Sequence, residues 1–262
     1  MYKILNKFLA SKLFDKLPRY FARRIFKIFK IFFVETNLTS LPNNNHPTII
    51  DKDYQEEAIK KNIDKFYKPF STCSYLLEVL SVYGANKKEI SILDFGANNL
   101  DNFIYLKRYV KNLEYYYHDL PSYNSLMEEL IKKNDLKDFK ILKSIDTLPR
   151  LDFVFFGSSI HYVNNYKEII QSIARQKCKY LIFSHTPFYK SNKNDKDIVL
   201  KQLNIHPIIN YAYLIQYDSF IQFMKNNNYK LISQNKNNFI KFLNFKNFNN
   251  FIFFSFLDLI FI

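Results

Sequence analysis

Polar and charged side chains follow five short apolar runs of this chain, at the point where each run ends. The first run, Ile90 to Leu93, leads into Asp94-Phe95-Gly96-Ala97-Asn98. Open α/β sheets bind nucleotide-like ligands at such a strand, turn and helix, because the ligand lies beyond the strand ends and against the helix N-terminus. Gly96 can adopt left-handed backbone and leaves room beside the main chain. A core strand that ends in an ordinary glycine turn accounts for the same residues equally well.

The second and third runs end in further acidic residues. Asp119 lies 25 positions after Asp94, within His118-Asp119-Leu120-Pro121-Ser122. A carboxylate about 20 residues beyond the glycine turn can accept two hydrogen bonds from the adjacent hydroxyls of a ribose. Ser144-Ile145-Asp146 follows the third run, and Asp146 could accept a hydrogen bond from an adenine amine. The pattern predicts a nucleotide-like site that includes Asp119, Leu120 and Asp146.

Histidines follow the fourth and fifth runs. The fourth run leads into Phe156-Gly157-Ser158-Ser159-Ile160-His161-Tyr162-Val163, and the fifth into Ser184-His185-Thr186-Pro187-Phe188. A histidine titrates near neutral pH and could take a proton from a hydroxyl group of a substrate. His161 and His185 are therefore the candidate general bases, although each could equally be a hydrogen-bonded structural residue. Ser158 is assigned to the cofactor side of the same edge.

Other catalytic classes lack the residues that they need. The chain has no serine-hydrolase elbow, phosphate-binding P-loop or zinc-ligand spacing, which argues against hydrolase, kinase and metalloenzyme functions. Cys73 and Cys178 form no metal-spaced pair and no disulfide framework. We therefore expect no metal ion and a reducing, cytoplasmic setting.

The elements that would position these loops alternate along the chain. Apolar runs predict strands at 90–94, 114–118, 139–142, 151–157 and 179–184, and helical periodicity predicts helices at 102–110, 122–133, 165–175 and 218–227. Two last strands, 229–233 and 249–256, can form a hairpin that inserts one antiparallel strand, and helices at 54–68 and 70–83 precede the sheet. This order predicts a Rossmann-like α/β fold with a mostly parallel sheet of about seven strands and helices on both faces.

Composition supports one large domain with extensions. The 262 residues are 48% hydrophobic and 18% aromatic, which provides a sizeable core. Of only three glycines, two fall at the ends of predicted strands. A polar stretch around residue 42 predicts a boundary, so we expect a helical extension at 1–36, a linker at 37–53 and the main domain at 54–262.

The N-terminal extension is strongly basic. Residues 1–33 hold nine Lys and Arg against the single Asp15, in a chain whose net charge is +14. Apolar residues recur there at helical spacing, and Pro18 is expected to break the segment into two helices. The charges exclude a membrane span or a signal-peptide core. Binding to an anionic membrane surface and packing on the domain with a solvated basic face both remain open, and nucleic acid is disfavoured.

The apolar C-terminal end poses a related question. Residues 251–262 are too few to span a bilayer and include Asp258. We expect a buried strand there, while a second membrane contact remains open.

Taken together, the five loops resemble class I S-adenosylmethionine-dependent methyltransferases. More narrowly, they resemble a bacterial methyltransferase family found among surface-polysaccharide genes, whose first, fourth and fifth loops read Asp-Phe-Gly-Gly-Gly, Ser-Ser-x-Leu-Gln-Tyr-Leu and Asp-Arg-Thr-Pro-Phe. The corresponding segments here are Asp94 to Asn98, Ser158 to Val163 and Ser184 to Phe188. The resemblance runs from about Tyr54 to Tyr229.

The resemblance implies S-adenosylmethionine as cofactor and a sugar hydroxyl of a surface glycan, or of its lipid-linked precursor, as methyl acceptor. Four positions depart from the family pattern: Ala97 and Asn98 replace glycines, His161 replaces glutamine and His185 replaces arginine. Side chains at 97 and 98 would crowd the methionine part of the cofactor. The alternative is a non-catalytic methyltransferase fold that serves as a binding module docked at the membrane.

Overall fold

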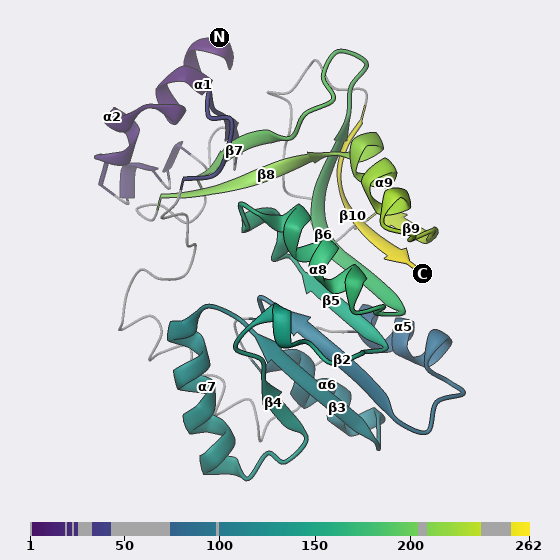
Figure 1. Cartoon of the computed structure of the whole chain (residues 1–262). Coiled ribbons are helices and arrows are strands. Elements are labelled where there is room, and N and C mark those ends of the chain that lie inside the picture. The colour runs from purple at the N-terminus through teal and green to yellow at the C-terminus, as the bar shows by residue number, and fades with distance from the viewer. Residues whose placement is uncertain are drawn as a thin grey trace.

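The computed structural model describes residues 2–18, 20–22, 24–25, 33–42, 74–97, 100–203, 209–236 and 253–262. These residues form a mixed α/β structure around one sheet of ten strands, with helices on both of its faces (Figure 1). The predicted Rossmann-like fold class is confirmed. The predicted helix 54–68, most of the predicted linker, Cys73 and Asn98 lie outside the described residues.

Five parallel strands form the centre of the sheet, in the spatial order β4-β3-β2-β5-β6. They are β2 (Ile90–Phe95), β3 (Leu113–His118), β4 (Phe139–Ile141), β5 (Phe153–Gly157) and β6 (Tyr180–Lys190). Four of them lie within two residues of the predicted ranges, and β6 runs six residues further. Because the strands are parallel and in register, Phe95 pairs with His118 and Gly157 with Ser184. The five predicted loops therefore share one edge of the sheet.

The side chains of these strands alternate between two apolar layers, as the period of two requires. Leu93, Val154 and Leu181 pack on one face beneath α8 (Tyr166–Arg175) and α9 (Tyr217–Asn226). Ile92, Phe153 and Ile182 pack on the other face, under α5 (Ser74–Tyr83), α6 (Asp101–Tyr109) and α7 (Pro121–Asn134). Burial on both faces explains why these strands read as nearly continuous apolar runs.

The C-terminal strand closes the sheet in the antiparallel sense. Strand β10 (Phe253–Phe261) lies between β6 and β9 (Leu231–Lys236) and pairs antiparallel with both. The insertion of one antiparallel strand was predicted, although the strand ends five residues later than expected. Leu257, Leu259 and Phe261 are fully buried. The apolar end of the chain therefore belongs to the core.

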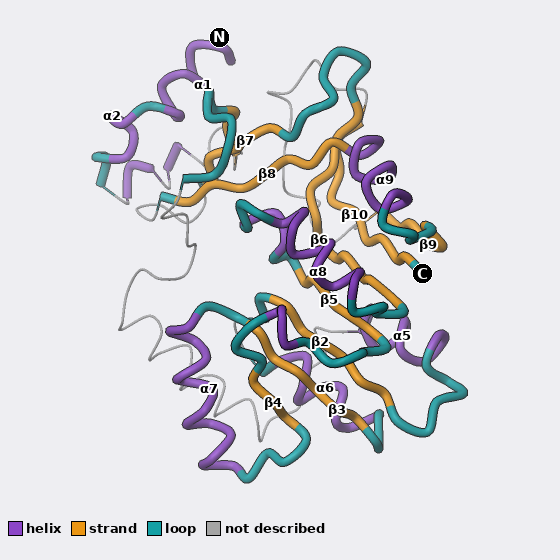
Figure 2. Tube along the Cα trace, viewed as in Figure 1, coloured by secondary structure: helices purple, strands orange, loops and turns teal. Residues whose placement is uncertain are grey.

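Three strands that the sequence analysis did not assign form a wing beyond β6. They are β1 (Phe33–Glu35), β7 (Ile198–Gln202) and β8 (Asn210–Gln216). Strand β8 continues the sheet from the far end of β6, where Phe188 pairs with Ile215, and β7 and β1 follow it in antiparallel order. Figure 2 shows this wing extending away from the central strands.

The N-terminal helices pack on the wing. Helices α1 (Tyr2–Ala10) and α2 (Lys12–Asp15) are separated at Ser11, whose hydroxyl oxygen accepts the Phe14 N–H at 3.4 Å, so the first break precedes Pro18. Leu9 and Phe14 are buried with Leu203 beyond β7. None of the helices in the described part of the chain is long and apolar enough to cross a membrane.

Candidate functional site

Asp94 lies inside the protein at the end of β2, behind the first loop. Its side chain is 1% exposed, and Oδ2 accepts hydrogen bonds from Asn102 of α6, at 2.7 Å, and from the Tyr115 hydroxyl. Burial raises the Asp94 pKa to about 6, although these two hydrogen bonds oppose the shift. Oδ1 is buried and has no hydrogen-bond partner among the described residues. The site therefore keeps one buried acceptor atom that is available to a donor.

The glycine turn that follows is fixed by its neighbours. Gly96 has φ +66°, and its N–H donates to the His118 carbonyl oxygen at 2.7 Å. A Cβ at this position would lie 2.5 Å from Cβ of Ser159. Gly96 is thus required by backbone conformation and by the close approach of the fourth loop. The turn continues into half-buried Ala97, while Asn98 lies outside the described residues.

The second loop directs another carboxylate to the same region. Asp119 Oδ1 accepts the Leu120 N–H at 2.7 Å, and Oδ2 accepts the Tyr117 hydroxyl at 3.3 Å. The charge of Asp119 contributes to the raised pKa of Asp94, so the two carboxylates are close enough to interact. Burial and Asp119 together raise the Tyr117 pKa, which keeps that phenol protonated. Asp119 is half-buried and oriented by its own loop.

The third loop carries its acidic residue on the surface. Asp146 is exposed, and its carboxylate accepts hydrogen bonds from Ser144 at 3.4 Å and from Ser172 of α8 at 3.3 Å. Ser144 also caps the short helical turn by accepting the Asp146 N–H at 3.2 Å. Asp146 is therefore held toward α8.

Backbone contacts join the fourth loop to the first and the fifth. Ser158 is exposed, has φ +59°, and donates its N–H to the Ser184 carbonyl oxygen at 2.9 Å. The buried Ser159 hydroxyl donates to the Phe95 carbonyl oxygen at 2.6 Å. The first, fourth and fifth loops consequently form one connected edge.

His161 lies in the interior of that edge. It is 1% exposed, its ring centroid lies 4.2 Å from that of Tyr162, and Nδ1 has no hydrogen-bond partner among the described residues. Burial lowers the His161 pKa to about 3, with a smaller contribution from the charge of His185. His161 is therefore neutral at pH 7 and poorly suited to accept a proton there.

His185 is half-buried and has an unusual backbone. Its φ is +51°, which is rare for a non-glycine residue, and such strain clusters at functional sites. Nδ1 lies 2.8 Å from Oγ of Ser184, and the main-chain N–H donates to Oδ1 of Asp258 at 2.9 Å. Burial lowers the His185 pKa, and the negative charge of Asp258 opposes that shift.

Several residues of this edge were not singled out as site residues from the sequence. Asp258 reaches it from β10, 73 residues after His185, and Tyr115 reaches it from β3. A buried acid within an apolar strand, and tyrosines at inward positions of a strand, were the available signals. Neither signal says which loop the side chain meets.

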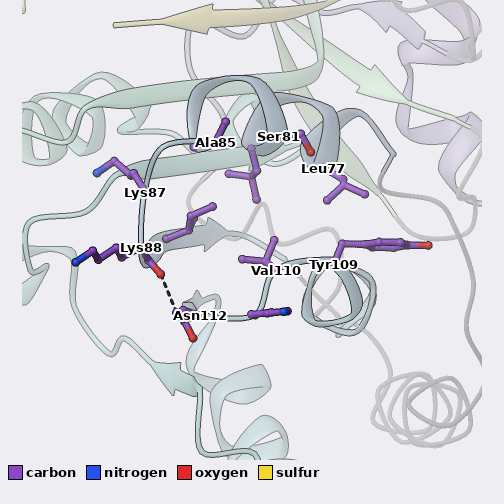
Figure 3. Close-up of a pocket in the computed structure, with 12 residues that line it drawn as sticks. Leu77, Ser81, Ala85, Lys87, Lys88, Tyr109, Val110 and Asn112 are labelled. Atoms are coloured by element: carbon purple, nitrogen blue, oxygen red, sulfur yellow. Dashed lines mark hydrogen bonds between the residues drawn. The ribbon is translucent and has the colours of Figure 1, made fainter.

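A cavity of about 430 Å³ lies elsewhere, at the amino ends of the strands. Its walls come from the end of α5, the end of α6 and the segments before β2 and β3, as Figure 3 shows. The ammonium groups of Lys87 and Lys88 point away from it, and Lys87 pairs with Asp152. This cavity is therefore separate from the five loops at the carboxyl edge.

Solved structures, two methyltransferases among them, share this fold. A proposed sarcosine dimethylglycine methyltransferase from Galdieria sulphuraria has a TM-score of 0.53 at 12% identity, over 92% of this chain and 97% of its own. The 1,6-didemethyltoxoflavin-N1-methyltransferase of Burkholderia thailandensis, solved with that compound and S-adenosylhomocysteine, has a TM-score of 0.51 at 10% identity, over 87% and 93%. The N-terminal domain of EvdMO1, crystallised in the presence of S-adenosylhomocysteine and D-fucose, has a TM-score of 0.50 at 10% identity, over 80% and 94%.

Sequence comparison adds no closer relative. No protein-family model matches the chain, and no curated protein matches it. At identities near 10%, the structural likeness demonstrates a shared fold, and one fold can host several functions.

Proposed function

We propose that this protein is an S-adenosylmethionine-dependent methyltransferase. The observation that carries the proposal is the pair of interacting carboxylates, Asp94 and Asp119, beside the Gly96 turn at the carboxyl edge of the sheet. This is the edge at which open α/β sheets bind their ligands. Two of the solved structures of the same fold, which were crystallised with S-adenosylhomocysteine, support the choice of cofactor.

The two carboxylates fit that cofactor, whereas side chains at Ala97 and Asn98 would narrow the space for its methionine part. The buried Oδ1 of Asp94, which has no hydrogen-bond partner among the described residues, can accept a hydrogen bond, and the Asp119 carboxylate suits a ribose diol. Asp146 is the proposed acceptor for the adenine amine. Other proposed contacts come from the first, second and fourth loops: Phe95, Gly96, Ala97, Asn98, Leu120 and Ser158. The bound cofactor would supply an electrophilic methyl group.

His185 is the proposed general base for the acceptor hydroxyl. Its ring is half-buried, whereas His161 is enclosed and stays neutral to about pH 3. A base at this position contributes roughly 10²–10⁴-fold to a rate, and orientation of the acceptor contributes further. His161 is the second candidate, because its Nδ1 has no partner in the described part of the chain and suits a hydrogen bond to the acceptor.

The proposed acceptor is a sugar hydroxyl of a surface glycan or of its lipid-linked precursor, which would be methylated at the cytoplasmic face of the membrane. The loop resemblance to methyltransferases of polysaccharide genes supports this class, as does the D-fucose used with one neighbour of the same fold. The N-terminal segment supports the location, because several of its apolar side chains are exposed between basic residues. They are Ile4, Phe8, Leu13, Tyr20 and Phe21.

Calorimetric titration with S-adenosylhomocysteine tests the cofactor site. We expect binding by the unmodified protein and roughly 10- to 100-fold weaker binding by Asp119→Asn, because hydrogen bonds to a charged group contribute about 1.5–3 kcal/mol. Asp135→Asn is the control: it makes the same chemical change in an exposed turn, where asparagine also tolerates φ +50°.

Methyl transfer to nucleotide sugars and lipid-linked glycans then tests the activity. Transfer to any of them establishes the acceptor class. No binding of the unmodified protein at millimolar S-adenosylhomocysteine would contradict the enzyme proposal. That result would favour the alternative of a non-catalytic binding module.

A further inference from the structure

Three polar residues from two strands meet at an irregularity in the sheet. Leu257 pairs with Thr186 and Leu259 with Phe183, so Asp258 of β10 lies opposite both Ser184 and His185 of β6. One residue opposes two, which is the arrangement of a β-bulge. Bulges next to active sites re-aim a side chain, and here the affected residue is the proposed base.

The hydrogen bonds at this bulge determine which group donates and which group accepts. Oδ1 of Asp258 accepts the His185 main-chain N–H at 2.9 Å and the Ser184 hydroxyl at 2.8 Å. A hydroxyl has a single proton to donate, and Ser184 gives it to the carboxylate. Ser184 Oγ can then only accept from Nδ1 of His185, which lies 2.8 Å away. The ring therefore carries its proton on Nδ1 and leaves a lone pair on Nε2.

We propose that Ser184 and Asp258 are positioning residues that hold His185 in the Nδ1–H tautomer, so that Nε2 is the atom that accepts the proton of the acceptor hydroxyl. The inference rests on the proposed role of His185 as a base. It gives a role to Ser184 and Asp258, two polar residues that are only 2% and 6% exposed. Packing alone would not require polar side chains at these positions.

The proton balance follows from this arrangement. The acceptor O–H bond breaks, an Nε2–H bond forms, and the electron pair stays on the acceptor oxygen. His185 becomes an imidazolium with Nδ1–H still bonded to Ser184, and no proton moves along the chain to Asp258. The negative charge of Asp258 stabilises the imidazolium, as an acid does beside a catalytic histidine.

Other titratable groups around His185 remain neutral. His161, from the fourth loop, carries no charge at pH 7, because burial lowers its pKa to about 3. Tyr75 of α5 is close enough to feel the charge of Asp258, and burial together with that charge raises its pKa and keeps it neutral. Among the described residues, Asp258 is thus the group whose charge favours the protonated form of His185.

Nitrogen NMR of the full chain with ¹⁵N-labelled histidine tests the tautomer at pH 7.5, without any substrate or cofactor. The His185 signals are assigned by their loss in His185→Gln. We expect a protonated Nδ1 and an unprotonated Nε2 in the unmodified protein. The opposite tautomer would overturn the proposal, whatever the activity of the variants.

Variants of Ser184 test whether its hydroxyl sets the tautomer of His185. Ser184→Ala should shift the His185 ring toward the Nε2–H tautomer, and Ser184→Thr, which keeps the hydroxyl, should restore Nδ1–H. Ser159→Ala is the matched control. It also removes a buried serine hydroxyl, but that hydroxyl belongs to the fourth loop and donates to the Phe95 carbonyl oxygen. An unchanged tautomer in Ser184→Ala would exclude Ser184 as the positioning residue.

Turnover separates this inference from the proposed function. Ser184→Ala should lower kcat by roughly 10- to 100-fold, part of the 10²–10⁴-fold contribution of a general base, with little change in cofactor affinity. His185→Gln should lose the whole contribution. Full activity of His185→Gln would refute the base and leave the NMR result standing. Unaltered kcat and pH profile in Ser184→Ala, with His185→Gln inactive, would refute the positioning role.

Discussion

Gly96 combines two requirements that can be separated by mutation. Gly96→Ala would put a side chain at φ +66° and within 2.5 Å of Ser159 Cβ, so we expect a loss of roughly 2–4 kcal/mol in unfolding free energy. Gly157→Ala is the comparison: its Cβ would meet the Phe155 ring, and no strained φ adds to that contact. Urea denaturation should show the larger loss for Gly96→Ala. Equal losses would mean that the turn is less constrained than the contacts indicate.

Asp94 gives the protein a specific dependence of stability on pH. Its folded pKa of about 6 exceeds the value of about 3.9 expected in an unfolded chain, so the folded state holds the proton more tightly. The contribution of Asp94 is therefore favourable below pH 4 and is lost as pH rises through 6. Relative to Asp94→Asn, the unmodified protein should lose roughly 2 kcal/mol between pH 4.5 and 7.5.

The comparison with Asp94→Asn is needed because the contribution of His161 to the unfolding free energy changes with pH in the opposite direction. Its folded pKa of about 3 is depressed, so its contribution is lost as pH falls below the unfolded value of about 6.5. The histidine is common to both proteins and cancels in the difference. A difference in unfolding free energy that does not vary with pH would contradict the raised Asp94 pKa.

At the scale of elements, the N-terminal helices depend on one buried ion pair. Lys201 of β7 is 2% exposed, pairs with Asp15, and donates to the main-chain oxygens of Leu9 at 3.3 Å and Ser11 at 3.5 Å. Removing one partner of a buried pair costs about 3–5 kcal/mol, because the other charge is left uncompensated.

Lys201→Met should therefore release α1 and α2 and accelerate tryptic cleavage within residues 2–25. Replacing both partners, Lys201→Met with Asp15→Leu, should restore much of the protection, since apolar pairs replace buried ion pairs well. Lys190→Met is the control, because Lys190 and Asp218 form an exposed pair worth at most about 1 kcal/mol. Equal cleavage rates for the two single variants would show that the helices are held by apolar contacts alone.

The central strands could be predicted from sequence, and the wing could not, for a physical reason. Strands β2 and β5 are buried on both faces and read as apolar runs between turns. In β7, the buried position 201 is a lysine whose partner lies 186 residues earlier in the chain. A single sequence shows the charge and not the distant acid that makes its burial tolerable. Lys201 therefore interrupts the apolar pattern from which a strand would have been predicted.

The same limit applies to the candidate site. The positions of Asp94, Gly96 and Asp119 were predictable, because each lies at the end of a strand or just after it. The Asp258 contact depends on the register of β10 against β6, which the sequence alone does not specify. The neutral state of His161 depends on its burial, in a turn that packs on β6 and β8. Residue types thus predicted which loops form the edge, while tertiary contacts determine the orientation and the protonation state of the side chains there.

At the scale of the whole molecule, the proposed membrane surface and the proposed site are joined through one strand. Strand β6 carries His185 near its middle, and its far end pairs with β8, the first strand of the wing. The wing in turn carries α1 and α2 (Figure 1). Docking of the N-terminal segment on a membrane would therefore fix the orientation of the site relative to a lipid-linked acceptor.

The exposed apolar side chains of that segment allow the membrane proposal to be tested without deleting it. Ile4, Leu13 and Phe21 are 76%, 71% and 56% exposed, and the basic residues around them include exposed Lys7 and Lys12. Insertion of such side chains, added to attraction for anionic lipid, should bind the protein to vesicles that contain phosphatidylglycerol, more weakly as salt rises. Each replacement by serine should weaken binding by about 1 kcal/mol, or roughly 5-fold, since burial at the interface is partial.

Val82→Ser is the matched control, because Val82 is 69% exposed on α5, far along the chain from the basic segment. It should leave vesicle co-sedimentation unchanged, and none of the four variants should lower the melting temperature, since all four side chains are exposed. Equal pelleting with neutral and anionic vesicles, insensitive to salt, would refute the electrostatic part of the proposal. Equal effects of Val82→Ser and Leu13→Ser would refute the specific role of the N-terminal face, and the helices would then serve only to cover the wing.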